Sequence, residues 1–566
     1  MKNIPYYYAR PIADLRQMFY ESCELYKDNV AYLSKDEGPD YREIKYSQVL
    51  EDVNALGTAL IDLGLKDKKI ALIGENRYEW SISYFSVICG TGTVVPLDRM
   101  LQAYEIENCL KRAEVSAVIY SDKLEEKVEQ TIEKIDSVKY LITMGKTSKN
   151  NKILSIHDLV KKGKELVNAG NTKFTDTTVD NTALATLLFT SGTTSESKAV
   201  MLSHENLAFD IMGGIKLVDF TSEDRFLSIL PIHHTYECTC GFLLPFYAGA
   251  SVAYCEGLRY ISSNMKEAKP TIVLLVPLIA ESLYSKIWEG IEKQGKTKTV
   301  KTMVKITNVI GKQKLKKKLF HAIHENFGGR LRLLVAGAAA FNPEVSKGLR
   351  GLGITGIQGY GLTECSPLVA VNRTIDFKDE ALGLPLPDSE VKINNPNEEG
   401  IGEIIVKGKH VMAGYYKAPD LTEEVLKDGW LYTGDLGLID RDGFIHMRGR
   451  KKNVIITKNG KNIYPEEIEA MLYEIPHIKE CMVYSKDDDE TVKDTKVVAA
   501  LFLNKEYCDN LYADSPKTDE ELKSIVWDEV KKVNQNLVFE KRVKEITIRD
   551  TEFEKTTTMK IKRYLA

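Results

Sequence analysis

The chain lacks a long hydrophobic run. Its longest apolar stretch, residues 272–280, contains Pro277 and is nine residues long, whereas a membrane-spanning helix needs about 20 apolar residues. The first fifteen residues also lack an apolar segment, so we expect no secretory signal. These absences predict a cytoplasmic protein, with peripheral binding at the inner face of the membrane as an open alternative.

An excess of charge of one sign is missing as well. The 77 basic and 81 acidic residues nearly balance, giving a net charge of -4, and a dedicated nucleic-acid-binding protein would carry a clear basic excess. Glycine (38) and proline (17) are present in ordinary amounts, which excludes collagen-like and low-complexity chains. With 43% hydrophobic residues over 566 positions, the chain can form three to four domain-sized units.

The nine cysteines follow no disulfide framework. Cys238 and Cys240 form one C-x-C pair near His233 and His234, which leaves a zinc site open. A second cysteine pair or an H-x-x-x-H motif does not accompany them. We therefore favour reduced cysteines in a cytosolic protein.

Short apolar runs alternate with helical patterns in the first third of the chain. This pattern predicts an α/β fold, with a mostly parallel sheet covered by helices. The expected strands are residues 69–73, 93–96, 115–120, 186–190 and 331–336, and the expected helix is 80–87.

The sequence texture changes after about Gly383. Short strands at 403–407 and 444–447 lie between glycine-rich turns, which suits a small β-barrel or β-subdomain. A new segment then begins near Lys451, with a helix at 465–473 and a strand at 496–502. We therefore predict two domains, residues 1–450 and 451–566.

Residues 293–324 contain ten lysines and no acidic residue. Val300, Met303, Val304 and Thr307 recur at helical spacing, which predicts a basic amphipathic helix. A solvated helical face is the simpler interpretation. Attraction to an anionic membrane or to a polyanionic substrate is the alternative.

Several polar motifs follow predicted strands or turns. The first is a Ser/Thr/Gly loop that ends in a lysine, and such loops can hold phosphate oxygens through backbone N–H groups and hydroxyls. It does not have the spacing of a Walker loop. Its candidate residues are Thr190, Ser191, Gly192, Thr193, Thr194 and Lys198.

A second motif places Tyr360 between two glycines, which leaves backbone space for a ring to stack on the tyrosine. It reads Gln358-Gly359-Tyr360-Gly361-Leu362-Thr363-Glu364, and Glu364 supplies an oxygen ligand of the kind that Mg²⁺ prefers. Asp435 follows a glycine turn and could accept the hydroxyls of a ribose. A buried turn and a common Asp-Gly turn remain the simpler interpretations of these two motifs.

The order and separation of these motifs resemble the adenylate-forming superfamily of acyl-CoA synthetases, luciferases and nonribosomal adenylation domains. The likeness covers nearly the whole chain. Bacterial long-chain fatty-acid–CoA ligases are the most similar group, judged by residues 230–237, 358–364 and 459–469. The resemblance implies a large N-terminal domain of stacked α/β sheets with a β-barrel subdomain, and a small mobile α+β C-terminal domain.

The resemblance also implies a ligase that works in two steps. A carboxylate attacks the α-phosphate of ATP with Mg²⁺ to give acyl-AMP and pyrophosphate, and the thiol of CoA then attacks the acyl carbon and releases AMP. The implied substrate is a medium- to long-chain fatty acid. A carrier-protein phosphopantetheine as acceptor, an aryl or short-chain acid as substrate, and a catalytically inactive nucleotide-binding protein are the alternatives.

The resemblance assigns roles to individual residues. Lys560 would bridge the carboxylate and the α-phosphate, His234 would lie near the acyl carboxylate, and Thr193 and Glu364 would hold Mg²⁺. Lys452 would be a hinge that lets the segment around Gly460 replace Lys560. The remaining assignments concern the nucleotide: Tyr360 on one face of adenine with Gly337, Ala338 and Ala339 along the other, Thr363 at the phosphate, and Asp435 and Arg450 at the ribose.

This sequence departs from the family pattern at two places. Ser195, Ser197 and Ala199 stand where the family loop has Gly, Pro and Gly, and Met559 stands where a glycine precedes the lysine. A serine forced into a positive φ costs roughly 1 kcal/mol. We therefore expect a less mobile or slightly reshaped loop and an altered turn at Lys560.

Overall fold

The computed structural model describes residues 4–35, 38–132, 135–147, 150, 152–190, 198–310, 313–456, 462–487, 495–555 and 561–563. Contacts divide the chain into two units. The first comprises Met1–Glu390 and Val406–Leu431, and the second comprises Val391–Ile405 and Tyr432–Ala566. The predicted boundary after residue 450 lies within the second unit, between a strand and a short helical turn.

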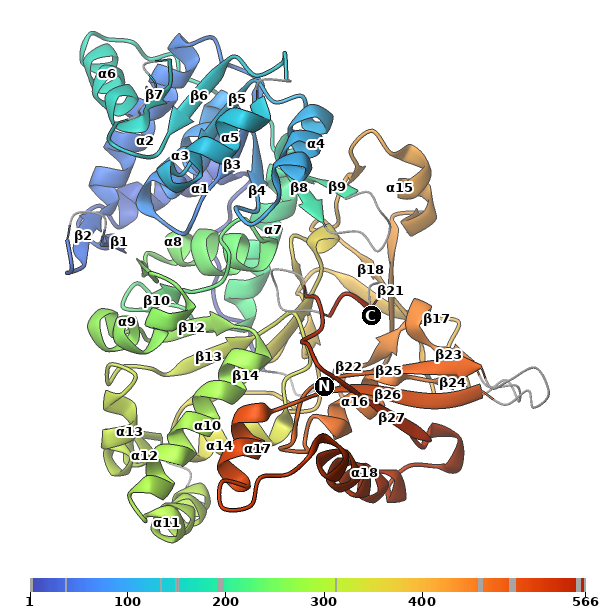
Figure 1. Cartoon of the computed structure of the whole chain (residues 1–566). Helices are drawn as coiled ribbons and strands as arrows, with labels where there is room; N and C mark the ends of the chain where they lie inside the picture. Colours follow the sequence, from blue (N-terminus) through green and yellow to red (C-terminus); the bar gives the residue numbers. More distant parts are fainter. Residues whose placement is uncertain are drawn as a thin grey trace. The chain divides into compact units, whose positions relative to one another are not determined.

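The first unit contains an eight-stranded sheet in the order β19-β9-β8-β4-β3-β5-β6-β7. Strands β3 to β7 run parallel, as the apolar runs predicted. Figure 1 shows α3 (Tyr78–Ser86), α4 (Ala103–Ala113) and α5 (Glu125–Ile132) around these strands. The strand bounds are β3 Lys68–Ile73, β4 Gly92–Leu97, β5 Ala117–Tyr120, β6 Tyr140–Thr143, β7 Leu154–Ser155, β8 Leu184–Thr190, β9 Lys198–Ser203 and β19 Gly414–Tyr415.

A nine-stranded sheet in the same unit follows the order β16-β15-β14-β13-β12-β10-β11-β1-β2. Its central strands are parallel, and the strands at both ends are antiparallel. The bounds are β1 Val30–Ser34, β2 Arg42–Lys45, β10 Arg225–Ser228, β11 Ser251–Tyr254, β12 Ile272–Leu275, β13 Leu333–Ala336, β14 Thr355–Gly361, β15 Leu368–Val371 and β16 Leu384–Pro385.

Helices connect these two sheets through an aromatic core. Helix α7 (His204–Leu217) contacts both β9 and β15. The ring of Phe85 in α3 lies 4.9 Å from Phe242 in the π-helix η3 (Tyr236–Leu243) and 4.7 Å from Phe246 in α8 (Leu244–Ala248). Phe19 in α1 (Leu15–Leu25) lies 4.7 Å from Phe85. Burial of such large rings is a main source of stability for the unit.

Two π-helical segments, η1 (Val87–Thr91) and η3, were not predicted. The expected helix at 80–87 ends at Ser86 and continues directly into η1. Single-turn π segments are rare and occur often at functional sites. Apolar periodicity does not distinguish them from an α-helix.

The second unit includes part of a five-stranded sheet with the order β17-β18-β21-β20, in which β22 also pairs with β21. This sheet forms the predicted β-subdomain, and the unit boundary runs through β18 and β21. The bounds are β17 Glu390–Asn394, β18 Gly402–Lys407, β20 Leu426–Lys427, β21 Trp430–Ile439 and β22 Ile445–Arg450.

The C-terminal part of the second unit is α+β. Strand β26 (Thr495–Leu503) pairs antiparallel with β25 (Ile478–Asp487) and parallel with β27 (Glu545–Arg549). Helices α16 (Pro465–Leu472) and α18 (Asp519–Gln535) share an apolar core with these strands. Helix α16 begins at a proline, which lacks the N–H that the first helical position leaves unpaired.

The basic stretch forms α11 (Thr297–Ile310) and α12 (Gln313–Leu319). The amphipathic prediction is confirmed, because Val300, Met303 and Val304 are partly buried and Thr307 is buried. Lys298, Lys301 and Lys305 are exposed on the other side of α11. Figure 1 shows these helices beside α13 (His321–Glu325) and α14 (Pro343–Gly351).

Lys316 does not belong to the exposed basic surface. It is 5% exposed, and its ammonium donates to Asn308 Oδ1 at 2.6 Å and to the Arg350 carbonyl at 2.9 Å. A lysine in a polar helix is ordinarily expected to be exposed to solvent. Here the carbonyl at the end of α14 requires a donor, and Lys316 supplies it.

The helices in the described part of the chain include no segment with the length and hydropathy of a membrane span.

We expect Gly163→Ala to destabilise the first unit. Gly163 lies in α6 (Ile156–Asn168), where an added Cβ would meet the Ala55 carbonyl oxygen of α2 (Tyr46–Asp62) at 1.9 Å. Such overpacking should lower the free energy of unfolding by roughly 3 kcal/mol. The unfolding midpoint in urea measures the change.

Gly290→Ala is the matched control. Gly290 lies in α10 (Pro277–Lys293), and nothing lies within 4 Å of a Cβ built there. This substitution should leave stability unchanged or raise it by about 0.5–1 kcal/mol. Equal midpoints for the two variants would contradict the close packing of α6 on α2.

Candidate active site

The Ser/Thr/Gly motif connects two paired strands. Thr190 ends β8 and Lys198 begins β9, and the two residues are partners in the antiparallel ladder. Ser191, Gly192, Thr193 and Thr194 lie outside the described residues, as do Ser195 and Ser197. Ala199 pairs with Phe189 inside the regular ladder and has no positive φ. Alanine in place of the family glycine therefore adds no backbone strain at this position.

Lys198 and Glu364 are connected by one tyrosine. The Lys198 ammonium lies 4.8 Å from the centre of the Tyr415 ring, and the Tyr415 hydroxyl donates to Glu364 Oε1 at 2.9 Å. The Glu364 carbonyl also accepts a bond from the Met412 N–H at 2.9 Å. Burial raises the pKa of Tyr415, so its hydroxyl remains a donor. A cation and a carboxylate from distant motifs therefore meet at one edge of the first unit.

Sequence analysis did not identify Tyr415 as a site residue. It lies in Gly414-Tyr415-Tyr416-Lys417, where a glycine and two aromatic residues precede a lysine. Strand β19 positions it, because Tyr415 pairs with Val200 of β9. The glycine beside paired aromatic residues was the signal available, but its partner strand could not be identified without the fold.

The loop that carries His234 lies against Thr363. Thr363 begins the short turn η5 (Thr363–Cys365), and its hydroxyl lies 3.2 Å from the hydroxyl of Thr235. His234 is half-buried and accepts the Tyr236 N–H at Nδ1 over 3.3 Å. The structure thus brings the predicted carboxylate residue next to the predicted phosphate residue.

Gly337, Ala338 and Ala339 follow β13, next to the end of β14. The Tyr236 ring packs under Gly337, where an added Cβ would meet the ring at 2.8 Å. The Tyr236 hydroxyl donates to the Val335 carbonyl at 2.9 Å. Ala338 has a φ of 72°, a conformation that a residue with a side chain adopts only when its surroundings require it.

The residues of the tyrosine motif occupy different environments. Tyr360 and Gln358 are buried, Gly359 is partly buried and Gly361 is exposed. A Cβ at Gly361 would lie 2.0 Å from the Pro367 carbonyl oxygen, so this turn requires glycine.

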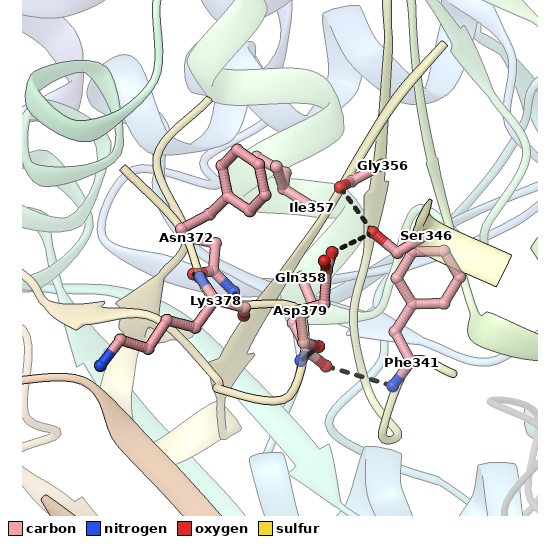
Figure 2. A pocket seen from close by; sticks show the side chains of 9 residues that line it. Phe341, Ser346, Gly356, Ile357, Gln358, Asn372, Lys378 and Asp379 are labelled. Carbon is pink, nitrogen blue, oxygen red and sulfur yellow. Dashed lines mark hydrogen bonds between the residues drawn. The ribbon is translucent and has the colours of Figure 1, made fainter. Parts of the chain in front are cut away.

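Gln358 holds a segment that lines a small pocket. Its amide donates to the carbonyls of Asp379 and Ala381 at 3.0 and 2.8 Å and accepts the Phe341 N–H at 3.1 Å. Figure 2 shows Gln358 between Phe341 and Asp379, and it shows Ser346 bonded to Gly356 and to Asp379. Arg350 pairs with the Asp379 carboxylate. The side chain of Gln358 thus stabilises the residues behind the tyrosine motif, and its contact with a nucleotide stays a prediction.

Within the second unit, Asp435 and Arg450 are paired. They are partners in the β21–β22 ladder, and Arg450 Nε lies 2.9 Å from Asp435 Oδ1. Asp435 is 1% exposed, and its N–H donates to Thr433 Oγ1 at 3.1 Å. The structure therefore brings together the two residues predicted to bind a ribose. Lys452 follows in the turn η6 (Lys451–Asn453), where partial burial and the nearby Arg450 and Arg563 lower its pKa.

Lys560 and Gly460 lie outside the described residues, but the residues around them are described. Strands β23 (Ile455–Ile456) and β24 (Asn462–Ile463), which flank Gly460, pair antiparallel. Near Lys560, Lys555 and Ile561 form an antiparallel bridge. Arg563 then donates to the Val483 carbonyl at 3.0 Å and pairs with the Glu469 carboxylate.

The zinc alternative gains no support. Among the described residues, no three His, Cys, Asp or Glu side chains are grouped to hold a metal ion. None of the nine cysteines forms a disulfide. Burial raises the pKa of Cys238 to about 12, which disfavours the thiolate that zinc requires.

Comparison with known proteins identifies the family and its similar members. A family model described as "AMP-binding enzyme" matches residues 19–416. The chain is 29% identical to the rat (Rattus norvegicus) protein "Long-chain-fatty-acid--CoA ligase 5" over 82% of this chain and 72% of that one. It is 27% identical to the Arabidopsis thaliana protein "Long-chain-fatty-acid--[acyl-carrier-protein] ligase AEE15, chloroplastic" over 96% of this chain and 83% of that one.

The fold is also similar to solved structures. A crystal structure of the anthranilate CoA ligase AuaEII with anthranoyl-AMP covers 100% of this chain and 98% of its own, with a TM-score of 0.76 at 20% identity. At this level of identity the similarity supports the fold, which is the predicted mixed α/β fold with a separate C-terminal part.

Proposed function

The chain belongs to the family of AMP-binding enzymes, and from this premise we propose that it is an acid–thiol ligase that converts a fatty acid to its CoA thioester through acyl-AMP. The observation that carries the proposal is the meeting of Lys198, Tyr415 and Glu364 beside the Thr235–Thr363 contact. The names of the rat and plant relatives support a long-chain fatty acid as substrate.

The first unit would bind the triphosphate. Lys198 offers a positive charge at the end of the Ser/Thr/Gly loop, and Thr363 offers a hydroxyl. Glu364 is an oxygen ligand that fits Mg²⁺, and Thr193 would be its second ligand. When bound, the ion neutralises negative charge on the phosphates. Tyr415 orients the Glu364 carboxylate by donating to Oε1.

Other residues would hold the nucleoside. Tyr360 would stack on adenine, with Gly337, Ala338 and Ala339 along the other face. Asp435 would accept the ribose hydroxyls, and its ion pair with Arg450 orients the carboxylate.

His234 and Lys560 would act on the acid. Carboxylate and phosphate repel each other, so a lysine between them stabilises the charge that develops in the transition state. Thioester formation at the same site requires different groups around the acyl carbon from those that acyl-AMP formation requires. We propose that residues 451–566 move about Lys452, so that the segment around Gly460 replaces Lys560.

The acceptor is free CoA in this proposal. The name of the plant relative, whose match covers 96% of this chain, favours a carrier-protein phosphopantetheine as the second candidate. Both acceptors present the same thiol arm, so competition between CoA and a loaded carrier protein would separate them.

Hydroxylamine trapping tests the first step directly. The protein is incubated with ATP, Mg²⁺ and acids from acetate to palmitate, with benzoate included, and acyl hydroxamate and pyrophosphate are measured. We expect both products with long-chain acids. Absence of both with every acid would refute the ligase.

Lys560→Ala separates the half-reactions. Loss of one charge contact in the transition state should slow acyl-AMP formation about a hundredfold or more. Thioester formation from supplied acyl-AMP should change much less. Equal losses in both steps would remove the role proposed for Lys560.

Tyr415→Phe tests the orientation of Glu364, with Tyr416→Phe as its matched control. The Tyr416 hydroxyl bonds to Lys69 and Glu114 on the other side of the strand end. Tyr415→Phe should raise the Mg²⁺ concentration needed for half-maximal acyl-AMP formation about tenfold or more, because a charge-assisted bond contributes roughly 1.5–3 kcal/mol. Tyr416→Phe should leave it unchanged, and identical behaviour of the two variants would contradict the orienting role.

The exposed lysines of α11 suit an anionic bilayer, from which a fatty acid could be taken up. Lys298, Lys301 and Lys305 form one exposed row, and Ile306 beside them is 54% exposed. Basic residues near an anionic surface contribute about 1 kcal/mol each, and an exposed apolar side chain adds insertion. We therefore propose peripheral membrane binding through this face.

Replacing Lys298, Lys301 and Lys305 together by Gln should reduce binding to phosphatidylglycerol vesicles at least tenfold at low salt. Binding of the wild type should weaken as salt rises. The matched control replaces the exposed Lys139, Lys161 and Lys173. Equal binding by the two triple variants, or no binding by the wild type, would refute the membrane face.

A further inference from the structure

The loop between β10 and η3 carries His234 and Thr235 and is held at both ends. It begins at Ser228, the last residue of β10, and ends at Glu237 in the first turn of η3. The Ser228 hydroxyl donates to Glu237 Oε1 at 2.5 Å. One hydrogen bond therefore closes the loop at its base.

Asn76 anchors the same loop to the eight-stranded sheet. It follows β3 and lies outside every motif singled out above. Its amide donates to Ser228 Oγ at 2.8 Å and to the Leu230 carbonyl at 2.7 Å, and its Oδ1 accepts the Ile232 N–H at 3.1 Å. All three of these hydrogen bonds join the Asn76 side chain to the loop.

The hydrogen bonds run in one direction, from the Asn76 amide to Ser228 and from Ser228 to Glu237. The Asn76 amide can only donate to Ser228 Oγ, so the Ser228 hydrogen remains for Glu237. Gly241 makes space for the acceptor, because a Cβ at Gly241 would lie 2.6–2.8 Å from the Glu237 carboxyl atoms. Glu237 is 1% exposed, and its Oε2 has no hydrogen-bond partner among the described residues.

We propose that Asn76, Ser228 and Glu237 are positioning residues that hold His234 and Thr235 at the acyl carboxylate site. This inference rests on the proposed function. Neighbouring contacts agree with it: Tyr236 is fixed to Val335, and Thr235 is fixed to Thr363. Because both ends of the loop are fixed, little conformational entropy is lost in placing His234 at the acid.

The chemistry of Glu237 adds a pH dependence. Burial raises the pKa of Glu237 to about 8, although the Ser228 bond opposes the shift. The Glu237 charge in turn raises the pKa of Tyr236, Cys238 and Cys240 on its own helix and of Cys255 after β11, and none of these four neighbours is a cation. Glu237 is therefore a neutral acid at pH 7 and becomes an uncompensated buried anion above pH 8.

The sign of the effect on stability follows from proton binding. Between the ordinary value of 4.5 and about 8, the folded state holds a proton that the unfolded state has released. The contribution of Glu237 to stability therefore falls as pH rises through this range. Glu237→Gln keeps the acceptor for Ser228 and removes this dependence.

The test combines hydrogen exchange with adenylation kinetics of the full chain. In Ser228→Ala and Asn76→Ala, the amides of residues 229, 230 and 232–236 should exchange at least tenfold faster. Hydroxamate assays should show kcat/KM for the fatty acid reduced ten- to a hundredfold, with the KM for ATP within twofold. Ser86→Ala is the matched control, because its buried hydroxyl donates to the Val53 carbonyl in α2, away from this loop, and it should match the wild type in both measurements.

Glu237→Ala should behave like Ser228→Ala, whereas Glu237→Gln should restore both exchange and activity at pH 7. Above about pH 8 the activity of Glu237→Gln relative to the wild type should rise. Ser228→Ala that matches Ser86→Ala in exchange and kinetics would overturn the proposal, and failure of Gln to rescue would overturn the acceptor role of Glu237. If the wild type forms no hydroxamate with any acid, the proposed function fails, and the exchange data alone decide whether the three residues fix the loop.

Discussion

The register of two neighbouring parallel strands determines where the candidate site forms. Ala336 of β13 pairs with Gln358 of β14, so the residues that follow the two strands emerge at the same edge of the sheet. Gly337 and its two successors come from one strand, and the Tyr360 motif comes from the other. Ligands of open α/β sheets bind at the carboxyl ends of such strands. A shift of the register by one residue would separate these two segments.

Much of the polar chemistry near this edge holds backbone in place. Gln358 and the Arg350–Asp379 pair hold the segment behind the tyrosine motif, and Asn76 with Ser228 holds the loop in front of it. Buried polar groups are costly unless they are paired. Several buried, paired polar groups fix the position of this one loop. Such precision suits a site that must place a carboxylate against a phosphate.

Local patterns were sufficient to predict several strands and the amphipathic helix α11, whereas the domain boundary at residue 450 and the roles of the candidate residues stay predictions. The apolar run at 69–73 and the helical spacing of Val300 and Val304 depend on near neighbours, so they could be read directly from the sequence. Tyr415, Asn76 and Lys316 could not, because each obtains its role from a partner more than thirty positions away in the chain. The π-helical geometry of η3 was missed for a different reason, since its apolar residues suit an α-helix equally well.

The C-terminal lysine raises a physical problem that its surroundings answer. Chain ends are usually poorly ordered, yet Lys560 would have to meet a transition state with accuracy. The described residues on either side of Lys560 are paired: Lys555 and Ile561 form a bridge, and the Lys562 N–H donates to the Glu554 carbonyl at 2.8 Å. Burial raises the pKa of Glu469 and Arg563 opposes this shift, so the pair is stable only while the chain end stays docked. The contacts of Arg563 with the Val483 carbonyl of β25 and with the Glu469 carboxylate of α16 therefore hold the described residues after Lys560 on the C-terminal α+β part.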